Sequence, residues 1–500
     1  MKVLFCHLGR ENLGIEYLSS VLKQAGHRVS LAFDPGLFGI NDNVFNITFL
    51  EKLFEQKKKV FEKILDFKPD IVAFSAYTDT YQWCCSIAER IKKELAAKIV
   101  FGGIHPTLVP ERVMAKDFID FVIVGEAEYS FLELLQSLES GQPIEQIKNL
   151  CFKQDGRIIK NELREPMEDI SSLGFPDKEL FEKDFNYRDD YLIITSRGCL
   201  FSCSYCCESF INRLYHNRFF RRRSVDSIME ELIYMKKRYN YRRVRFIDSV
   251  FFTDKKWLKA LLERFKQEIG VKFWCFGKVQ FLDEEVAELL RWAGCYGIEF
   301  GVQATNEDLR RAVLTRFETD EQNKKAFKIC DDYKLRYDID HMFGLPGEKE
   351  QDWIKAAEFY SRLKNLNRIK CHNLVYFPRL EIINAAKQDS ILSEDDIENI
   401  EEGRIVGSFF HPYLNKDKES EKVKKDFENL YKMLPLFRPS WTGFIIGHRL
   451  YKIFHFIPSF LIMFLQVIVA FKGRDPRFMI LTRYYLLYLR KRLKRVKFSN

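Results

Sequence analysis

Short apolar runs alternate with amphipathic stretches through the first part of the chain. The runs predict β-strands at 2–6, 29–33, 70–75, 98–102 and 121–124. The intervening stretches have the 3.6-residue period of helices, which we expect at 14–25, 51–67, 81–96 and 127–140. This alternation predicts an α/β domain with a doubly wound, Rossmann-like parallel sheet and helices on both faces. Ligands of such sheets bind at the carboxyl ends of the strands.

Three of these strand ends carry residues suited to a bulky ligand. The third strand leads into a polar loop that contains Thr78, and the fifth leads into Gly125-Glu126. The fourth ends in the run Gly102-Gly103-Ile104-His105-Pro106-Thr107, where paired glycines let backbone approach a ligand closely. Neither GxGxxG nor GxxxxGK[ST] follows the first strand, which argues against a dinucleotide or P-loop site. His105 alone is more often a structural histidine than a ligand.

A cluster of cysteines directly follows another buried-strand pattern. Cys199, Cys203 and Cys206 have the spacing C-x3-C-x2-C, with Tyr205 immediately before the third cysteine. Three thiolates can hold a [4Fe–4S] cluster and leave one iron open. A zinc site is the alternative, because Cys207 could supply a fourth thiolate. However, adjacent cysteines would strain one tetrahedral ion, and no second C-x2-C pair lies downstream.

The strand–helix alternation resumes after the cysteines. Together with the strand before them, the pattern predicts a partial (β/α)6 TIM-type barrel with its active site at the carboxyl ends of the strands. The six strands are expected at 191–196, 243–247, 272–276, 297–301, 336–343 and 370–375. The helices are expected at 224–239, 254–268, 283–292, 320–332 and 350–364. A charged, mostly helical region follows.

The loops and the cysteine spacing resemble those of radical S-adenosylmethionine (radical SAM) enzymes that carry an N-terminal cobalamin (B12)-binding domain. The resemblance implies that Cys199, Cys203 and Cys206 hold a [4Fe–4S] cluster whose open iron binds SAM. It also implies a cobalamin pocket lined by Thr78, Gly102, Gly103, His105, Pro106, Thr107, Gly125 and Glu126. The D-x-H-x-x-G pattern of other B12 proteins is absent from the sequence, which implies that cobalt has no histidine ligand from the protein.

The same resemblance assigns further positions to SAM. Tyr205 matches the aromatic residue that packs beside the adenine, and Asp248 matches a polar residue that faces SAM. Gln303 occupies the place of a Glu or Gln that reaches the ribose. Gly344 and Pro346 belong to a Gly-Leu-Pro-Gly-Glu turn near the adenine. A helix cap or a solvated loop residue is the alternative for Asp248 and Gln303.

We expect five segments along the chain. They are a cobalamin-binding domain at 1–149, a linker with a hairpin around Asp155-Gly156 at 150–188, the radical SAM core at 189–378, a helical region at 379–455, and an apolar helix with a basic tail at 456–500.

The net charge of +9 comes from the C-terminus, because residues 472–500 contain ten Lys and Arg but one acid. The neutral remainder argues against nucleic acid as a partner, and Arg221–Arg223 is expected to be a solvated face. Residues 456–471 are uncharged and apolar, slightly short of the roughly twenty needed to span a bilayer. Basic residues beside an apolar segment favour anionic lipid. We therefore expect a peripheral or re-entrant membrane anchor, with a buried helix or a single span as alternatives.

The resemblance implies an enzyme that cleaves SAM reductively to a 5′-deoxyadenosyl radical. C-methylation of an unactivated carbon on an apolar or natural-product substrate, such as a lipid, is the expected reaction. Oxidative cyclisation, rearrangement and methylthiotransfer are alternatives, whereas a non-enzymatic corrinoid carrier would not need the cysteines. The expected electron donor is a flavodoxin or ferredoxin. Twelve cysteines without a disulfide framework, and no signal-peptide pattern at Met1–His7, predict a cytoplasmic protein.

Overall fold

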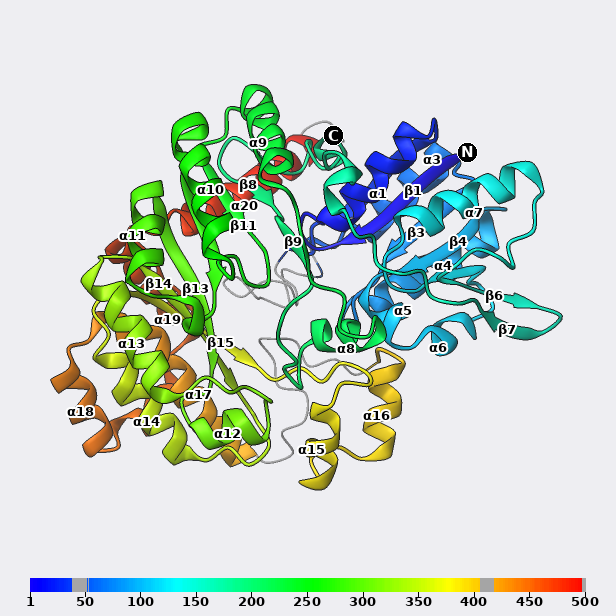
Figure 1. Ribbon diagram of the computed structural model, residues 1–500. Helices are drawn as coiled ribbons and strands as arrows, with labels where there is room; N and C mark the ends of the chain where they lie inside the picture. Colours follow the sequence, from blue (N-terminus) through cyan, green and yellow to red (C-terminus); the bar gives the residue numbers. More distant parts are fainter. Residues whose placement is uncertain (38–51, 53, 405–417, 497–500) are drawn as a thin grey trace. The chain divides into compact units, whose positions relative to one another are not determined.

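The computed structural model describes residues 1–37, 52, 54–404 and 418–496 (Figure 1). The chain forms two compact units that alternate along the sequence. The first comprises Met1–Asp184, Gly198–Arg221 and Val375–Tyr413, and the second comprises Phe185–Arg197, Arg222–Leu374 and Leu414–Asn500. The cysteine loop therefore belongs to the same compact unit as the N-terminal sheet.

The first unit is built on a seven-stranded sheet with the order β2-β1-β3-β4-β5-β6-β7. The first five strands in the sequence pair in parallel, and the last two are antiparallel. This is the doubly wound arrangement that the strand–helix alternation predicts. The strands are β1 (Lys2–Leu8), β2 (Arg28–Asp34), β3 (Ile71–Ser75), β4 (Lys98–Gly102), β5 (Phe121–Ile123), β6 (Leu150–Gln154) and β7 (Arg157–Lys160).

Helices cover both faces of this sheet, as Figure 1 shows in blue and cyan. They are α1 (Leu13–Gln24), α3 (Lys57–Phe67), α4 (Tyr81–Glu94), α5 (Ile104–Leu108), α6 (Pro110–Met114) and α7 (Glu128–Ser140). The later parts of the unit add α8 (Cys207–Leu214), α15 (Ile382–Gln388) and α16 (Glu394–Glu401).

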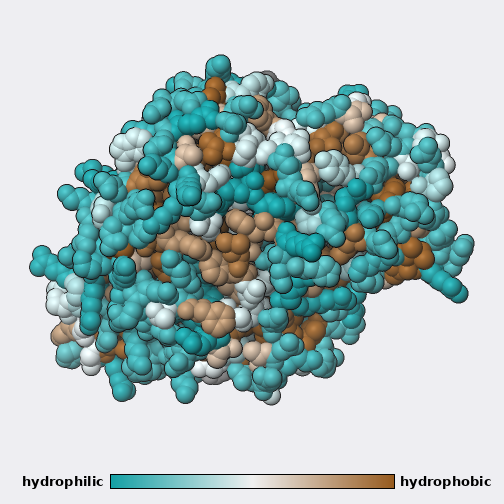
Figure 2. Space-filling model, viewed as in Figure 1, coloured by the Kyte–Doolittle hydropathy of each residue, from teal (hydrophilic) through white to brown (hydrophobic). Residues whose placement is uncertain are grey.

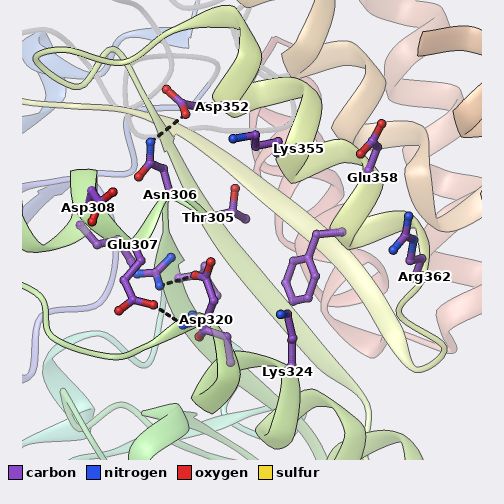
Figure 3. A pocket seen from close by; sticks show the side chains of 14 residues that line it. Thr305, Asn306, Glu307, Asp308, Asp320, Lys324, Asp352, Lys355, Glu358 and Arg362 are labelled. Carbon is purple, nitrogen blue, oxygen red and sulfur yellow. Dashed lines mark hydrogen bonds and ion pairs between the residues drawn. The ribbon is translucent and has the colours of Figure 1, made fainter. Parts of the chain in front are cut away.

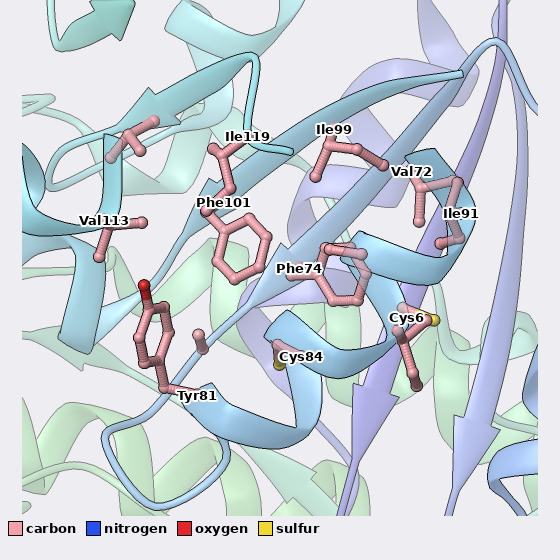
Figure 4. Packing of buried hydrophobic residues seen from close by; sticks show 14 of the residues in the cluster. Cys6, Val72, Phe74, Tyr81, Cys84, Ile91, Ile99, Phe101, Val113 and Ile119 are labelled. Carbon is pink, nitrogen blue, oxygen red and sulfur yellow. The ribbon is translucent and has the colours of Figure 1, made fainter. Parts of the chain in front are cut away.

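An apolar core lies between the sheet and α3, α4 and α6 (Figure 4). Phe74 of β3 and Phe101 of β4 stack at its centre, with their rings 4.8 Å apart. Side chains alternate along a strand, so Phe5 of β1 faces the other side of the sheet. There its ring contacts Phe131 of α7 edge to face at 6.1 Å. Both faces of the sheet are therefore buried by apolar packing.

The hairpin predicted around Asp155-Gly156 is present, and it extends the sheet beyond β5. Phe121 of β5 pairs with Phe152 of β6 in antiparallel register. Asp155 and Gly156 have φ values of 49° and 74°, as a two-residue type I′ turn requires. The segment after the hairpin also packs on the unit, because Lys178 is buried against α1 and forms ion pairs there.

The second unit is built on six parallel strands with the order β15-β14-β13-β12-β11-β8, the partial barrel expected from the sequence. The strands are β8 (Tyr191–Ile193), β11 (Arg243–Phe246), β12 (Lys272–Gly277), β13 (Cys295–Gln303), β14 (Tyr337–Phe343) and β15 (Leu366–Asn373). The helices between them are α9 (Val225–Tyr239), α10 (Lys255–Arg264), α11 (Glu284–Ala293), α12 (Glu307–Ala312), α13 (Asp320–Asp332) and α14 (Glu350–Ser361). Two short strands, β9 (Ser196–Arg197) and β10 (Arg221–Arg222), form a small separate sheet.

The C-terminal helices belong to the second unit and are drawn in orange and red in Figure 1. They are α17 (Lys418–Met433), α18 (Pro439–Gly447), the 3₁₀ segment η6 (Leu450–Phe456), α19 (Ser459–Gly473) and α20 (Pro476–Val496). Further short turns are η1 (Ile170–Leu173), η2 (Lys178–Leu180), η3 (Phe265–Ile269), η4 (Val279–Phe281) and η5 (Leu434–Leu436).

The length and apolar character of these helices bear on whether they could cross a membrane. In the part of the chain that the structure describes, no single helix is both long and apolar enough to cross a bilayer. The segments η6 and α19 meet the length and composition criteria as a pair, with a bend of 111° between them.

Candidate functional site

The three predicted cluster ligands lie on the loop that leads into α8. Cys203 is buried, whereas Cys199 and Cys206 are half-buried, and all three are free thiols. The backbone N–H of Cys206 donates a 3.1 Å hydrogen bond to the Cys203 carbonyl, which curls the loop between them. Burial raises the pKa of the Cys206 thiol to about 12, and the nearby Cys203 and Cys199 act in the same direction. The loop thus gathers three thiols in a partly enclosed setting.

The donor set of this loop fits an iron–sulfur cluster. Among the residues described, no three Cys, His, Asp or Glu side chains converge as they would around one metal ion. A cubane [4Fe–4S] cluster binds each cysteine through a different iron atom, so its thiolates surround a larger volume. Cys206 is also the N-cap of α8, and the positive end of a helix dipole favours a negatively charged group.

Hydrogen bonds from other segments hold the loop in place. The Asn212 side chain of α8 donates to the Cys199 carbonyl. The backbone N–H of Ile382, at the start of α15, donates to the Ser204 carbonyl at 3.1 Å. Tyr205, the predicted adenine neighbour, is half-buried between Ser204 and Cys206. These hydrogen bonds hold the loop on both sides of Cys203.

The predicted cobalamin loops at the ends of β4 and β5 are joined by one threonine. The Thr107 hydroxyl donates to the Gly103 carbonyl at 2.8 Å and accepts from the Gly125 N–H at 3.0 Å. Gly103 has a φ of +93°, and a Cβ there would lie 2.9 Å from the Ala76 nitrogen. Only glycine fits this approach between the loops after β3 and β4. Gly102, just before it, is half-buried and presents backbone at the strand end.

His105 lies beneath these loops rather than at their surface. It is fully buried, its Nδ1 is 3.1 Å from the Thr78 hydroxyl, and its ring centroid is 4.2 Å from that of Tyr81. Burial lowers the pKa of His105 to about 3, so the ring is neutral. Its Nε2 has no hydrogen-bond partner among the described residues. Pro106 beside it is also buried. The structure therefore brings Thr78 and His105 together as packing that supports the loop.

Glu126 is bound by an arginine that the sequence analysis placed on a solvated surface. Arg221 makes a two-fold ion pair with Glu126, with N–O distances of 2.8 and 2.9 Å. The expectation of a solvated basic face is wrong, because the side chains of Arg221 and Arg223 are 9% and 3% exposed. The Glu126 N–H also donates to the Tyr215 hydroxyl at 3.3 Å. The segment that follows the cysteines thus packs on the loop after β5, within the first unit.

Asp248 fixes the strand end that leads toward the cysteines. Its Oδ1 accepts hydrogen bonds from the Thr195 N–H, the Thr195 hydroxyl and the Ser196 hydroxyl, at 2.8, 2.9 and 2.6 Å. Asp248 is buried, and burial raises the pKa of its carboxyl. It is therefore neither a helix cap nor a solvated loop residue. Its Oδ2 is buried with no hydrogen-bond partner in the described chain, an orphaned acceptor that fits a polar ligand.

The other residues predicted to bind SAM lie at the ends of two adjacent strands of the barrel, β13 and β14. Gln303 terminates β13 with a φ of +68°, which is unusual for a residue other than glycine. Such strain is common at ligand sites. After β14, the Glu348 carboxylate accepts from the N–H groups of Gly344 and Leu345 at 2.8 and 3.2 Å, which closes the turn that contains buried Pro346. Burial raises the pKa of Glu348 to about 7.

The inside of the barrel carries charges that the sequence analysis did not assign. Glu299 of β13 is ion-paired with Lys370 of β15, and Asp340 of β14 lies 3.4 Å from His372. Burial, followed by the Asp340 charge, raises the pKa of Glu299 to about 7. The signal was present in the sequence, because Asp338 and Asp340 in one predicted strand, and Lys370 and His372 in the next, are two positions apart. That spacing places them on one face of each strand.

The structure also contains a charged pocket of about 450 Å³ between α12, α13 and α14 (Figure 3). None of the predicted site residues lines it. Some of its polar groups pair with one another: Asn306 donates to Asp352 at 2.8 Å, and Arg310 pairs with Asp320 at 2.7 Å. Figure 2 shows a mostly hydrophilic surface over α13 and α14. These contacts tie three helices together, while the Arg310 Nε and the Asn323 Oδ1 are buried with no hydrogen-bond partner among the described residues.

Comparison with known proteins identifies both domains. The family model "B12 binding domain" matches residues 10–135, and the model "Radical SAM superfamily" matches residues 193–360. An uncharacterized methyltransferase of Pyrococcus horikoshii is 26% identical over 359 residues, covering 70% of this chain and 73% of the relative. The anaerobic magnesium-protoporphyrin IX monomethyl ester cyclase of Synechocystis sp. is 23% identical over 363 residues, covering 69% and 67%.

Two solved structures share the fold. The radical SAM methyltransferase TsrM from Kitasatospora setae aligns with a TM-score of 0.61 at 18% identity, covering 77% of this chain and 76% of that one. The cobalamin-dependent radical SAM enzyme OxsB aligns with a TM-score of 0.65 at 16% identity, covering 99% and 80%. The two matched domains, in this order and on this fold, show that the chain belongs to the cobalamin-binding radical SAM enzymes, whose cofactors are a [4Fe–4S] cluster, SAM and cobalamin.

Proposed function

We propose that the enzyme methylates an unactivated carbon atom of an apolar small molecule. The observation that carries this proposal is the position of the three-cysteine loop, which lies in the same compact unit as the sheet matched by the B12-binding model. When bound, the cluster and SAM supply a carbon radical that removes a hydrogen atom, and cobalamin supplies a carrier for the methyl group. The methyltransferase name of the Pyrococcus horikoshii relative supports this assignment.

The residues divide into two groups by the unit that holds them. In the first unit, Cys199, Cys203 and Cys206 hold the cluster, with Tyr205 beside the adenine. The residues that build the cobalamin pocket are Thr78, Gly102, Gly103, His105, Pro106, Thr107, Gly125 and Glu126, of which Thr78, His105 and Glu126 act through the loop that they support. In the second unit, Asp248, Gln303 and the turn with Gly344 and Pro346 hold SAM.

The proposed substrate is small and apolar. The solved structure of TsrM contains tryptophan as its substrate, which shows that this fold accepts an aromatic small molecule. This chain contains 46 phenylalanines, which is many for its 500 residues. The proposed electron donor is a low-potential flavodoxin or ferredoxin, because cleavage of SAM at the cluster consumes one electron.

Two cysteines of the same segment, Cys203 and Cys207, provide a matched test of the cluster. Cys203→Ala should abolish 5′-deoxyadenosine formation by the reconstituted enzyme and lower its iron content. Cys207→Ala, the neighbour of a proposed ligand, should retain iron and 5′-deoxyadenosine formation. Equal loss in both variants would instead indicate a four-thiolate metal site. Retention of activity in Cys203→Ala would overturn the assignment of the cluster.

Oxidative cyclisation is the second candidate, favoured by the match to the Synechocystis cyclase. The two reactions differ in what becomes of SAM. Methyl transfer yields S-adenosylhomocysteine together with 5′-deoxyadenosine, whereas cyclisation yields 5′-deoxyadenosine without S-adenosylhomocysteine. The reconstituted enzyme, supplied with SAM, cobalamin, a reductant and a cell extract of small molecules, should form both products and add one CH₂ to its substrate. Formation of 5′-deoxyadenosine alone, with a product that gains no carbon, would favour the cyclase.

A further inference from the structure

The helices α18 and α19 are apolar almost all round, yet most of their surface is exposed. Of the twenty large apolar residues that are exposed in the described chain, ten lie between residues 441 and 471. They are Trp441, Phe444, Leu450, Ile453, Phe456, Phe460, Leu461, Phe464, Ile468 and Phe471. A helix that is hydrophobic on every side is normally buried in a protein core or in a membrane. Half of the exposed large apolar residues therefore lie within one short segment of the chain, residues 441–471.

Only one stripe of α19 is used for packing inside the protein. The buried residues of this helix are Ile462, Val469 and Gly473, which share one face and rest on α17 and β15. On a helix with 100° per residue, the opposite face carries the exposed residues, spaced three or four positions apart: Phe460, Phe464, Ile468 and Phe471. One face of α19 thus packs on α17 and β15, and the opposite face leaves a row of aromatic and aliphatic side chains exposed.

The bend before α19 adds to this surface. The segments η6 and α19 meet at 111°, around Ile457-Pro458. Phe456 lies at this bend and is 75% exposed, the highest value among the large apolar residues. Trp441 and Phe444 of α18, a helix that contacts η6, are also exposed, at 62% and 51%. Exposed apolar patches of this extent mark interaction sites.

The charge of the same segment indicates which kind of partner the apolar surface binds. No Asp or Glu occurs from residue 429 to residue 474. Five basic side chains in this range are exposed: Arg438, Arg449, Lys452, Lys472 and Arg474. Two acids from neighbouring helices, Glu350 and Asp426, contact η6, where they bond to Tyr451 and His455. An apolar segment whose own charges are all basic is complementary to an anionic lipid headgroup layer. A second copy of the same surface would bring like charges together, which disfavours self-association.

We propose that α18, η6 and α19 form a docking surface that binds the face of a bilayer containing anionic lipids, with Phe456, Phe460 and Phe464 inserted among the acyl chains. The packed stripe of α19 keeps the barrel attached to this surface. Membrane docking goes beyond the proposed reaction, since it holds for either a methyl transfer or a cyclisation. It gives the enzyme access to substrates that partition into the bilayer.

Flotation of the reconstituted full chain with lipid vesicles tests the apolar part of the proposal. The wild-type protein should float with vesicles of phosphatidylcholine and phosphatidylglycerol. The triple variant Phe456→Ser, Phe460→Ser, Phe464→Ser should lose at least about a hundredfold in partitioning, since three large side chains no longer insert. The matched control replaces three exposed apolar residues elsewhere, Ile158→Ser, Tyr234→Ser and Trp292→Ser, and should float like the wild type.

Charge reversal tests the choice of lipid. Arg449→Glu, Lys452→Glu and Arg474→Glu together should lower binding to the anionic vesicles at low salt by at least about tenfold. Reversal of three exposed lysines elsewhere, Lys237→Glu, Lys256→Glu and Lys272→Glu, should change it far less. Vesicles of phosphatidylcholine alone should bind the wild-type protein more weakly than anionic vesicles. The difference should shrink as salt is added.

The same variants separate docking from catalysis and from other partners. All should keep the far-UV circular dichroism and the 5′-deoxyadenosine formation of the wild type, because these side chains lie outside the proposed cofactor sites. Flotation of the phenylalanine variant equal to that of the wild type would overturn the proposal. So would a wild-type protein that ignores vesicles and forms a dimer that the phenylalanine substitutions dissociate, since the occupant would then be a second copy.

Discussion

Each unit of the molecule contains a buried cation that contacts at least two carboxylates and comes from a segment outside the sheet. In the first unit, Lys178 lies 2.5 Å from Glu11 and 2.9 Å from Glu16. In the second, Arg477 lies 2.7 Å from Asp338 of β14 and 2.8 Å from Asp475. The first contact fastens the segment after the hairpin to α1, and the second fastens the turn between α19 and α20 to the barrel. In both clusters, a buried ion-paired cation attaches a separate segment of the chain to the rest of its unit.

Their proton affinities differ because their charge balance differs. Burial raises the pKa of Glu16 well above its ordinary value, and Lys178 offsets this only in part because Glu11 shares the same cation. Burial would also raise the pKa of Asp475, but Arg477 and Arg368 outweigh it and hold that pKa below its ordinary value. Two arginines therefore face Asp338 and Asp475 in the second cluster, whereas Glu11 and Glu16 share one lysine in the first.

The geometry of the cations points in the same direction. Arg477 donates from Nε and Nη2 to the two oxygens of Asp475, at 2.9 and 2.8 Å, in the planar fork that suits a carboxylate. Its guanidinium carbon also lies 5.4 Å from the ring centroid of Trp274 inside the barrel. Lys178 offers a single ammonium group without such a fork. The comparison teaches that the cost of buried charge depends on the number and shape of the counterions, not on burial alone.

Among these variants, removal of Arg477 should give the largest loss in the free energy of unfolding. Arg477→Met leaves Asp338 and Asp475 buried with Arg368 as their remaining neighbour, and a broken buried ion pair costs about 3–5 kcal/mol. Chemical denaturation should report this loss, and hydrogen exchange should localise it to β14 and β15. The matched control is Arg474→Met, an exposed neighbour, with an expected change below about 0.5 kcal/mol. A loss below about 1 kcal/mol in Arg477→Met would mean that the cluster does not fasten α20 to the barrel.

Removal of Lys178 should lower the free energy of unfolding by less than removal of Arg477 does. Lys178→Met also leaves two buried carboxylates, but Glu16 can take up a proton, so we expect a loss of about 2–3 kcal/mol. Hydrogen exchange of β1 and α1 should report it. Adding Glu16→Gln to this variant should restore part of the loss, because the uncompensated charge is then gone. Lys58→Met, at an exposed position of α3, is the control and should be nearly neutral. A loss equal to that of Arg477→Met would break the comparison.

These clusters also show where sequence reasoning ends. The strands and helices of both sheets follow from local periodicity, and the cysteine loop follows from spacing within a few residues. Nothing near Lys178 in the sequence indicates Glu11 or Glu16, because the contact depends on the packing of a distant segment. Arg477 was interpreted as part of a lipid-facing basic tail. That interpretation is wrong for this residue, whose side chain is 10% exposed within the second unit.

The candidate site has the same limit. The family resemblance predicted Asp248 and Gln303, but the hydrogen bonds of Asp248 to Thr195 and Ser196 join two strands that are far apart in the sequence. The left-handed backbone of Gln303 likewise depends on a break in the pairing of β13 with β14. Local patterns therefore predict which residues bear the chemistry. The partners that orient them come from the tertiary fold.

The smallest predicted effect is a pH dependence of opposite sign in the two clusters. Glu16 has a raised pKa in the folded state, so its region should lose stability as pH rises from the ordinary carboxyl value of 4.5 toward that raised pKa. Asp475 has a lowered pKa, so its region keeps its stability above the ordinary value of 3.8 and loses it as pH falls below.

Hydrogen exchange of β1 and α1, compared with β14 and β15 across this pH range, should show the two trends, each on the order of 1 kcal/mol. Glu16→Gln should flatten the first trend alone, and Asp475→Asn should flatten the second alone, because each substitution removes one titrating group. Lys178 contributes no slope here, since its raised pKa keeps it charged well above this range. Trends of the same sign in both regions would show that the two clusters carry the same charge balance after all.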